Sequence, residues 1–373
     1  MPPQKPDHEY EQTALVLQGG GALGAYQAGA YEQLHAHHIL PSWFAGISIG
    51  SINAAILAGN KPEDRVEKLR AFWEEITDRP LEFPTLFASI LPRQNFTALS
   101  SMMGASFGIA PFFIPKFQTL WPQVTGTEVP SYYDTSPLYD TLLRYADFDL
   151  INSGAVRLSL GAVNIRTGNF VYFDNQNCTL TPKHVMASGA LPPGFPPIEI
   201  DGEYYWDGGL VSNTPLAYVL NKSEGEDTLV FQVDLFSASG DVPYSFDMIE
   251  ERRKDIVYSS RTRLNTDAFR EKHALRRAIS KLAQHIRDDE LRAMGLSDCV
   301  DLGEMRKVSI VHLIFRPSHY DGPTKDYEFS RKTMTENWQA GADDAHATMQ
   351  CDAWKMPPSD DEGIAVYDLA TRR

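Results

Sequence analysis

Hydrophobic residues near the N-terminus form short runs that alternate with helical patterns. Residues 13–18 (TALVLQ) are an apolar run that ends at glycine, which is typical of a buried parallel strand. Alanine, tyrosine and leucine recur at helical intervals over 24–38, and a short strand is expected at 43–46 before another helix at 49–59. Strand–helix–strand–helix at this spacing predicts an α/β domain with a mostly parallel sheet.

The later part of the chain adds strands and then long helices. Further strands are expected at 155–163, 169–173, 228–235 and 307–315. Residues 246–292 predict one or two long helices, and apolar residues at helical spacing over 327–349 predict an amphipathic helix near the C-terminus.

Composition and charge exclude several classes of protein. The 373 residues carry 34 Lys and Arg against 49 Asp and Glu, a formal net charge of −15. This acidic balance argues against a surface built for nucleic acid, so no nucleic-acid partner is expected. Three widely spaced cysteines cannot form a disulfide framework or a zinc-finger pattern. With no apolar signal segment and no apolar run of about 18 residues, we expect a cytoplasmic protein without a spanning helix.

Two segments depart from this average. Residues 80–122 hold only three charged residues, together with eight aromatic residues and six prolines. Residues 251–290 hold 11 Lys and Arg against 7 Asp and Glu. A solvated helix face with charge pairs four residues apart explains this basic stretch more readily than a docking surface for lipid phosphate.

A glycine run follows the first predicted strand and opens the first predicted helix. Gly19, Gly21 and Gly24 satisfy the dinucleotide-binding pattern GxGxxG, but residues 39–46 lack the acidic residue that this pattern requires. A nucleotide-dependent enzyme is therefore the weaker alternative. Consecutive glycines at a helix N-terminus also let backbone N–H groups converge on an anion.

A GxSxG motif lies between the second predicted strand and its helix. Gly46 and Gly50 flank Ser48, which is the arrangement of a nucleophile elbow. The following helix would offer its N-terminal dipole and the Ile49 N–H group to a developing oxyanion.

The base for this serine is expected to be Asp207, which precedes Gly208 and Gly209. Neighbouring Tyr204, Tyr205 and Trp206 would desolvate the carboxylate and raise its pKa. A triad with His312 or His319 satisfies the chain order of α/β-hydrolases, but 47 residues before Ser48 are too few for the strands that precede the elbow in that fold. No metal-ligand spacing such as HExxH appears, so neither a metal nor a cofactor is expected.

Together these motifs resemble the patatin-like phospholipases. The agreement comprises GGGxxG at 19–24, GxSxG at 46–50 and DGG at 207–209, with ASGALP at 187–192 and NTPL at 213–216 around the last motif. The resemblance implies a three-layer α/β/α fold and a metal-independent Ser48–Asp207 dyad. It also implies oxyanion-hole N–H groups from Gly19, Gly20 and Gly21.

The resemblance covers roughly residues 12–236 and suggests how the chain is divided. We expect an N-terminal tail at 1–11, a catalytic domain at 12–236 and a mainly helical C-terminal region at 237–373 that completes or flanks the core. Residues 280–373 resemble the extra C-terminal region of a bacterial subgroup of the family. Within the catalytic domain, residues 80–122 would form an apolar cap or lid over the elbow, or core under an insertion. One departure is Leu23, where many members carry Arg or Lys; it leaves the head-group preference open.

The implied activity is hydrolysis of acyl esters of lipids, of the phospholipase A, lysophospholipase or lipid acyl hydrolase type. The expected partner is a lipid or hydrophobic ester, with transient contact at a membrane or lipid-granule surface. Two alternatives stay open: a hydrolase of a hydrophobic polyester or storage-granule ester, and a non-catalytic lipid-binding protein.

Overall fold

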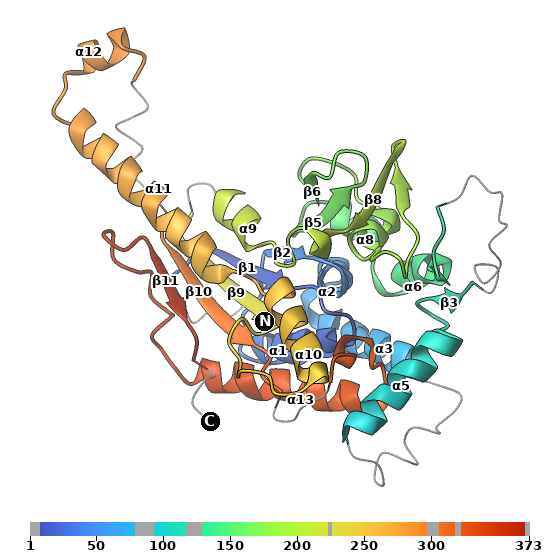
Figure 1. Ribbon diagram of the computed structural model, residues 1–373. Helices are drawn as coiled ribbons and strands as arrows, with labels where there is room; N and C mark the ends of the chain where they lie inside the picture. The colour runs from blue at the N-terminus through green and yellow to red at the C-terminus, as the bar shows by residue number, and fades with distance from the viewer. Residues whose placement is uncertain are drawn as a thin grey trace.

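A computed structural model of the chain describes residues 8–78, 93–116, 129–222, 226–296, 306–317 and 322–369. Within these ranges nine strands form one mostly parallel sheet covered by helices on both faces (Figure 1). The sheet contains β1 Gln12–Leu17, β2 Trp43–Gly46, β5 Arg157–Asn164, β6 Phe170–Asp174, β7 Ile198–Ile200, β8 Glu203–Asp207, β9 Thr228–Asp234, β10 Val308–Ile314 and β11 Ile364–Tyr367. The three-layer α/β/α fold expected from the sequence is thereby confirmed.

The order of strands across the sheet is β11-β10-β9-β1-β2-β5-β8-β7, and β6 also pairs with β5. Neighbouring strands from β11 to β5 run parallel, whereas β6 and β8 pair antiparallel with β5 and β7 pairs antiparallel with β8. Two further short strands, β3 Ile114–Pro115 and β4 Tyr133–Asp134, form a separate antiparallel pair. The sheet therefore changes from parallel to antiparallel at β5.

Alternation along β1 shows why both faces of the sheet are covered. Leu15 and Leu17 pack into the larger core on one face, whereas Ala14 and Val16 belong to the cluster on the other face. Successive side chains of a strand point to opposite faces, so an apolar run such as 14–17 requires a helical layer on each side.

The helices confirm most of the sequence expectations. They are α1 Gly24–Ala36, α2 Ile49–Ala58, α3 Arg65–Thr77, α5 Arg93–Phe107, α6 Ser136–Tyr145, α7 Phe148–Asn152, α8 Pro182–Ser188, α9 Leu216–Lys222, α10 Phe246–Tyr258, α11 Thr262–Ala283, α12 Asp288–Ala293 and α13 Arg331–Met349. Residues 246–292 form the two long helices α10 and α11 and most of the short helix α12, and the C-terminal amphipathic helix is α13. The sequence pattern does not predict β11, because four residues are too few for periodicity to distinguish a strand from a loop.

The C-terminal region is joined to the sheet and to the first helix. β10 extends the sheet in parallel with β9, and α13 lies along α1 (Figure 1). A side chain at Gly29 would overlap the Trp338 carbonyl, and one at Gly341 would overlap the Tyr26 carbonyl. These glycines therefore let the two helix backbones approach closely, and residues 15–34 and 329–349 share one hydrophobic core.

Several charged residues on the exposed faces of α10 and α11 pair with neighbours on the same helix, whereas Glu251 and Asp255 of α10 pair with Lys325. Arg253 contacts Glu250, while Arg263 and Arg270 both contact Asp267, at spacings of three or four residues. These are the pairs expected for a solvated face. None of the helices in the described ranges has the combined length and low charge content that crossing a bilayer requires.

Candidate active site

The candidate nucleophile Ser48 occupies a strained turn between β2 and α2. Its backbone has φ 54° and ψ −123°, in a region that non-glycine residues seldom adopt. A side chain at Gly46 would overlap the Gly50 carbonyl, and one at Gly50 would overlap the Leu17 carbonyl. Both glycines of GxSxG are thus required by close backbone packing around the elbow.

Segment 187–192, the ASGALP motif, holds the elbow and the aspartate strand in place. The Ser48 N–H donates to the Ser188 backbone carbonyl at 3.1 Å, and the Ser48 nitrogen also lies 3.1 Å from Ser188 Oγ. The Asp207 N–H donates to the Ala190 carbonyl at 3.0 Å. The two residues of the expected dyad are therefore fixed through one short loop, a role that the motif signalled but that sequence reasoning did not assign.

Asp207 lies at the end of β8, paired with Ala162 of β5, and is 2% exposed. Its carboxylate accepts a hydrogen bond from the Gly209 N–H at 2.7 Å, and Ser48 lines the same cavity. Burial raises the pKa of Asp207 to about 7, while Ser48 and the Gly209 N–H act in the opposite direction. A carboxylate with this pKa is well suited to general base chemistry near neutral pH.

The groups that bury Asp207 differ in part from those expected. Tyr204 and Trp206 alternate with Asp207 along β8 and so point to the opposite face of the sheet, which corrects their expected role. Tyr258 and Tyr327 line the same cavity as Asp207. Both come from the C-terminal region, which explains why local sequence did not identify them.

The glycine loop follows β1 and lies beside Ser48. A Cβ at Gly19 would lie 3.1 Å from the Ser48 Cβ, and Gly21 has φ +55° and packs against the Asp326 carbonyl. The N–H groups of Gly20, Gly21 and Ile49 donate to no backbone carbonyl of the described residues. The Gly19 N–H instead donates to the Asn213 carbonyl at 3.1 Å, so its expected role as an oxyanion donor does not fit this conformation.

The remaining motif glycines are packing residues. A side chain at Gly24 would lie 2.6 Å from Ile49 Cγ1, and one at Gly208 would lie 2.7 Å from the Gly161 carbonyl oxygen. Leu23, at the position where many family members carry a cation, is buried in the hydrophobic core. It has no access to a substrate head group.

A cavity of about 490 Å³ opens above Ser48 and Asp207. Its apolar wall includes Ile52, Met102, Leu191, Phe236 and the ring cluster of Phe112, Phe113, Tyr133, Phe195 and Phe329. Neighbouring ring centroids in this cluster lie between 4.8 and 6.1 Å apart. Such a wall is suited to a hydrocarbon chain.

Part of the expected cap contributes to this wall. α5 and the residues after it supply Ala98, Met102, Phe112 and Phe113, whereas 79–92 and 117–128 lie outside the described residues. The role of residues 80–122 as a cap or lid over the elbow stays a prediction.

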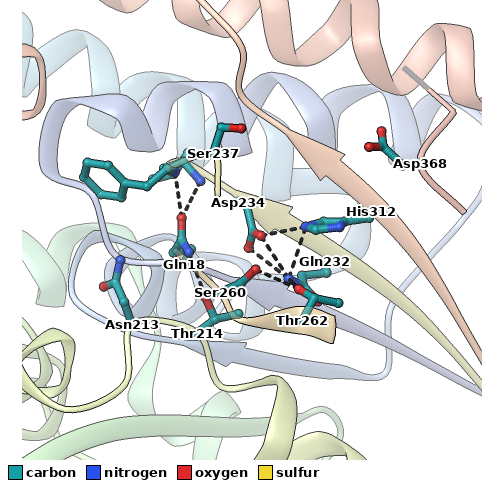
Figure 2. A network of polar contacts seen from close by, with 12 residues as sticks. Gln18, Asn213, Thr214, Gln232, Asp234, Ser237, Ser260, Thr262, His312 and Asp368 are labelled. Atoms are coloured by element: carbon teal, nitrogen blue, oxygen red, sulfur yellow. Dashed lines mark hydrogen bonds and ion pairs between the residues drawn. The ribbon is translucent and has the colours of Figure 1, made fainter. Parts of the chain in front are cut away.

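Of the two alternative histidines, the one that the structure describes, His312, does not join Ser48. His312, on β10, has its Nε2 atom 2.6 Å from Asp234 and does not line the cavity (Figure 2). His319 lies outside the described residues. In the ranges that the structure describes, no three His, Cys, Asp or Glu side chains cluster closely enough to hold a metal ion.

Comparisons with solved structures find distant similarity. VipD from Legionella pneumophila is 16% identical with a TM-score of 0.40, covering 92% of this chain and 67% of that one. Human GIVD cytosolic phospholipase A2 is 11% identical with a TM-score of 0.32, covering 59% of this chain and 42% of that one.

Comparisons of sequence match defined parts of this chain. Triacylglycerol lipase SDP1L of Arabidopsis thaliana is 44% identical over 50 residues, which are 13% of this chain and 6% of that protein. Residues 256–361 match a family described as patatin phospholipase. Residues 15–220, more than half of the chain, match the patatin-like phospholipase family, and the chain belongs to that family.

Proposed function

We propose that this protein hydrolyses acyl esters of lipids, with Ser48 as nucleophile and Asp207 as general base. The observation that carries the proposal is the placement of Ser48, on a strained elbow, with the buried carboxylate of Asp207 in the lining of one apolar cavity. Membership of the patatin-like phospholipases supports a lipid substrate. The intact Ser48–Asp207 pair disfavours a role as a non-catalytic lipid-binding protein.

The reaction would proceed through an acyl-enzyme. Asp207 takes the proton of the Ser48 hydroxyl as Oγ bonds to the ester carbonyl carbon, and the carbonyl oxygen becomes an oxyanion. Collapse of this intermediate breaks the bond to the alcohol, which leaves with the proton from Asp207. Water then attacks the acyl-serine, Asp207 takes its proton, and the proton returns to Ser48 as the fatty acid departs.

The oxyanion would be stabilised by the N–H groups of Gly20, Gly21 and Ile49. Ile49 is the first residue of α2, so its N–H adds to the positive end of the helix dipole. Removing one donor of this kind typically costs about 10²–10³ in kcat. No step in this scheme requires a metal.

The decisive experiment is hydrolysis of a panel of lipids by the wild type and by Ser48→Ala. The panel contains a phosphatidylcholine, a lysophospholipid, a triacylglycerol and a hydroxyalkanoate polyester, which also separates the rival substrates. We expect Ser48→Ala to abolish turnover and labelling by a fluorophosphonate while its circular dichroism is unchanged. Hydrolysis that persists in the Ser48→Ala protein would refute the mechanism.

We also propose that α5 brings the cavity to a lipid surface. Met102 lines the cavity and is 60% exposed, and Phe107 at the end of the same helix is 70% exposed. Residues 94–115 carry no charged side chain, so this surface is suited to insertion among apolar chains.

Contact through α5 would be driven by apolar burial rather than by lipid charge. We expect Phe107→Asp to reduce hydrolysis of vesicle-bound lipid several-fold while hydrolysis of a soluble butyrate ester is unchanged. Leu282→Asp, on the exposed distal part of α11, is the control. Equal effects of both substitutions on vesicle substrates would argue against a docking role for α5.

A further inference from the structure

Asn213, six residues after Asp207, links the aspartate loop to the glycine loop through its side chain and its backbone. Its Nδ2 atom donates to the Gly19 carbonyl at 3.0 Å, and its own carbonyl accepts the Gly19 N–H at 3.1 Å. The residue is 8% exposed and lines the cavity. Gly19 is thus held from both sides by one residue that lies 194 positions later in the chain.

The bond to the Gly19 carbonyl has a consequence for the next N–H group. A peptide bond is planar and trans, so its carbonyl and its N–H point in opposite directions. Holding the Gly19 carbonyl therefore fixes the direction of the Gly20 N–H, which donates to no backbone carbonyl of the described residues. We propose that Asn213 is a positioning residue that aims the Gly20 N–H at the oxyanion. This inference rests on the proposed Ser48-dependent hydrolysis.

A primary amide is suited to this position because it offers two donors. The second hydrogen bond of Asn213 Nδ2 goes to the Tyr258 carbonyl, also at 3.0 Å. Tyr258 is the last residue of α10, where helix carbonyls lack partners within the helix. The Asn213 amide thus uses both N–H groups on two fixed carbonyls. A serine would keep one donor, and an ionised aspartate would keep none.

The Oδ1 atom of Asn213 is confined by glycines of both motifs. A side chain at Gly19 would overlap this oxygen, and a Cβ at Gly209 would lie 3.0 Å from it. The glycines therefore leave room for the amide and restrict its rotation. This observation connects the DGG and glycine-run motifs through a single side chain.

Gln18 supports the same arrangement from the end of β1. Its Oε1 accepts the N–H groups of Leu235 and Phe236 at 2.6 and 2.9 Å, and its Nε2 donates to Thr214 and to the Tyr258 carbonyl. Figure 2 shows Gln18 between the segment after β9 and the loop that carries Asn213 and Thr214. The Tyr258 carbonyl is consequently a fixed point against which Asn213 is oriented.

The test compares Asn213→Asp and Asn213→Ser with the wild type on a soluble butyrate ester. We expect kcat to fall about 100-fold for Asn213→Asp and about tenfold for Asn213→Ser, with KM changed less than about twofold. Ser212→Ala is the matched control, because among the described residues the Ser212 hydroxyl forms a hydrogen bond only with the nearby Thr214 carbonyl, at 3.3 Å.

A second readout separates positioning from a merely structural role. Octyl boronic acid forms a tetrahedral adduct with an active serine, whereas octanol only fills the acyl cavity. We expect boronate affinity to fall in parallel with kcat/KM in the two variants, and octanol affinity to stay within twofold of the wild type.

Several outcomes would overturn the proposal. The first is an Asn213→Asp protein whose kcat and boronate affinity stay within threefold of the wild type. The second is a variant in which only KM changes and kcat does not. The third is loss of the fold in both variants. Turnover that persists in Ser48→Ala would instead reject the proposed hydrolytic mechanism itself. Ser48-dependent turnover that is indifferent to Asn213 would reject only the positioning role.

Discussion

Replacing Asp207 by asparagine should stabilise the protein while it abolishes hydrolysis. Asparagine has the size of the protonated aspartate and can still accept the Gly209 N–H, but it carries no charge to desolvate. The ionised carboxylate is buried at 2% exposure, so the wild type bears a desolvation penalty that the variant lacks. The wild type should therefore be less stable than Asp207→Asn, because it keeps a buried carboxylate that can act as a base.

The magnitude follows from the pKa of Asp207, which burial raises from the ordinary 3.8 to about 7. Below pH 3.8 both states hold the proton and the substitution should have little effect. Between pH 3.8 and pH 7 the Asp207 carboxyl group ionises in the unfolded chain but keeps its proton in the folded protein. The wild type therefore loses stability progressively as pH rises, and the full desolvation penalty is present above pH 7. At about 1.36 kcal/mol per pKa unit, the gain of Asp207→Asn grows from about 2 kcal/mol at pH 5 to about 4 kcal/mol at pH 8.

Urea unfolding of the two proteins at pH 5 and pH 8 measures this difference directly. Contributions from other titrating groups cancel because they are common to both proteins. Asp201→Asn, on an exposed turn where asparagine also tolerates the positive φ, should change the free energy of unfolding by less than about 0.5 kcal/mol. An Asp207→Asn protein that is no more stable than the wild type at pH 8, or whose gain is independent of pH, would refute the reasoning.

Three other predictions follow from particular contacts. Because Asp207 must be ionised to act as base, kcat/KM should fall about tenfold per pH unit below a pKa of about 7, and a profile that is flat down to pH 5 would exclude this base. Gly341→Ala should lower stability by about 2–4 kcal/mol in thermal unfolding, since a methyl group would overlap the Tyr26 carbonyl between α1 and α13; an unchanged Tm would contradict this packing. Lys325→Met should cost about 3–5 kcal/mol, because the buried ammonium lies 2.9 Å from Glu251 and 2.8 Å from Asp255; urea unfolding tests this, and a neutral effect would show that the cation is dispensable.

The proposed nucleophile and its proposed base were identifiable because their motifs encode local backbone requirements. Gly46 and Gly50 are dictated by carbonyls packed against the elbow, and a positive φ at Ser48 follows from the same turn. These constraints involve close chain neighbours or the adjacent strand, so they leave a recognisable pattern in the sequence. The raised pKa of Asp207 and its cause, burial, were also anticipated, whereas Tyr258 and Tyr327, which line the same cavity, were not.

The oxyanion donors illustrate where local reasoning failed. The glycine run predicts three available N–H groups, but the Gly19 N–H is used by the Asn213 carbonyl. No pattern around residue 19 signals a partner that lies 194 positions away. Hydrogen bonds of this kind depend on which loops meet at the ends of the strands, and this is a property of the whole sheet.

By itself, the sequence determined the alternation of strands and helices, the strained serine turn, the glycine run and the candidate base, because short-range sterics and hydrophobic periodicity act within a few residues. Only the tertiary structure decided which N–H groups stay available and how Tyr258, Asp326 and Phe329 complete the cavity. Tyr258, Asp326 and Phe329 come from the C-terminal region, and they reach the site because β10 extends the sheet beside β9 and α13 packs against α1. Burial, and with it the chemistry of Asp207, is a sum over contacts from distant parts of the chain, and local pattern cannot supply that sum.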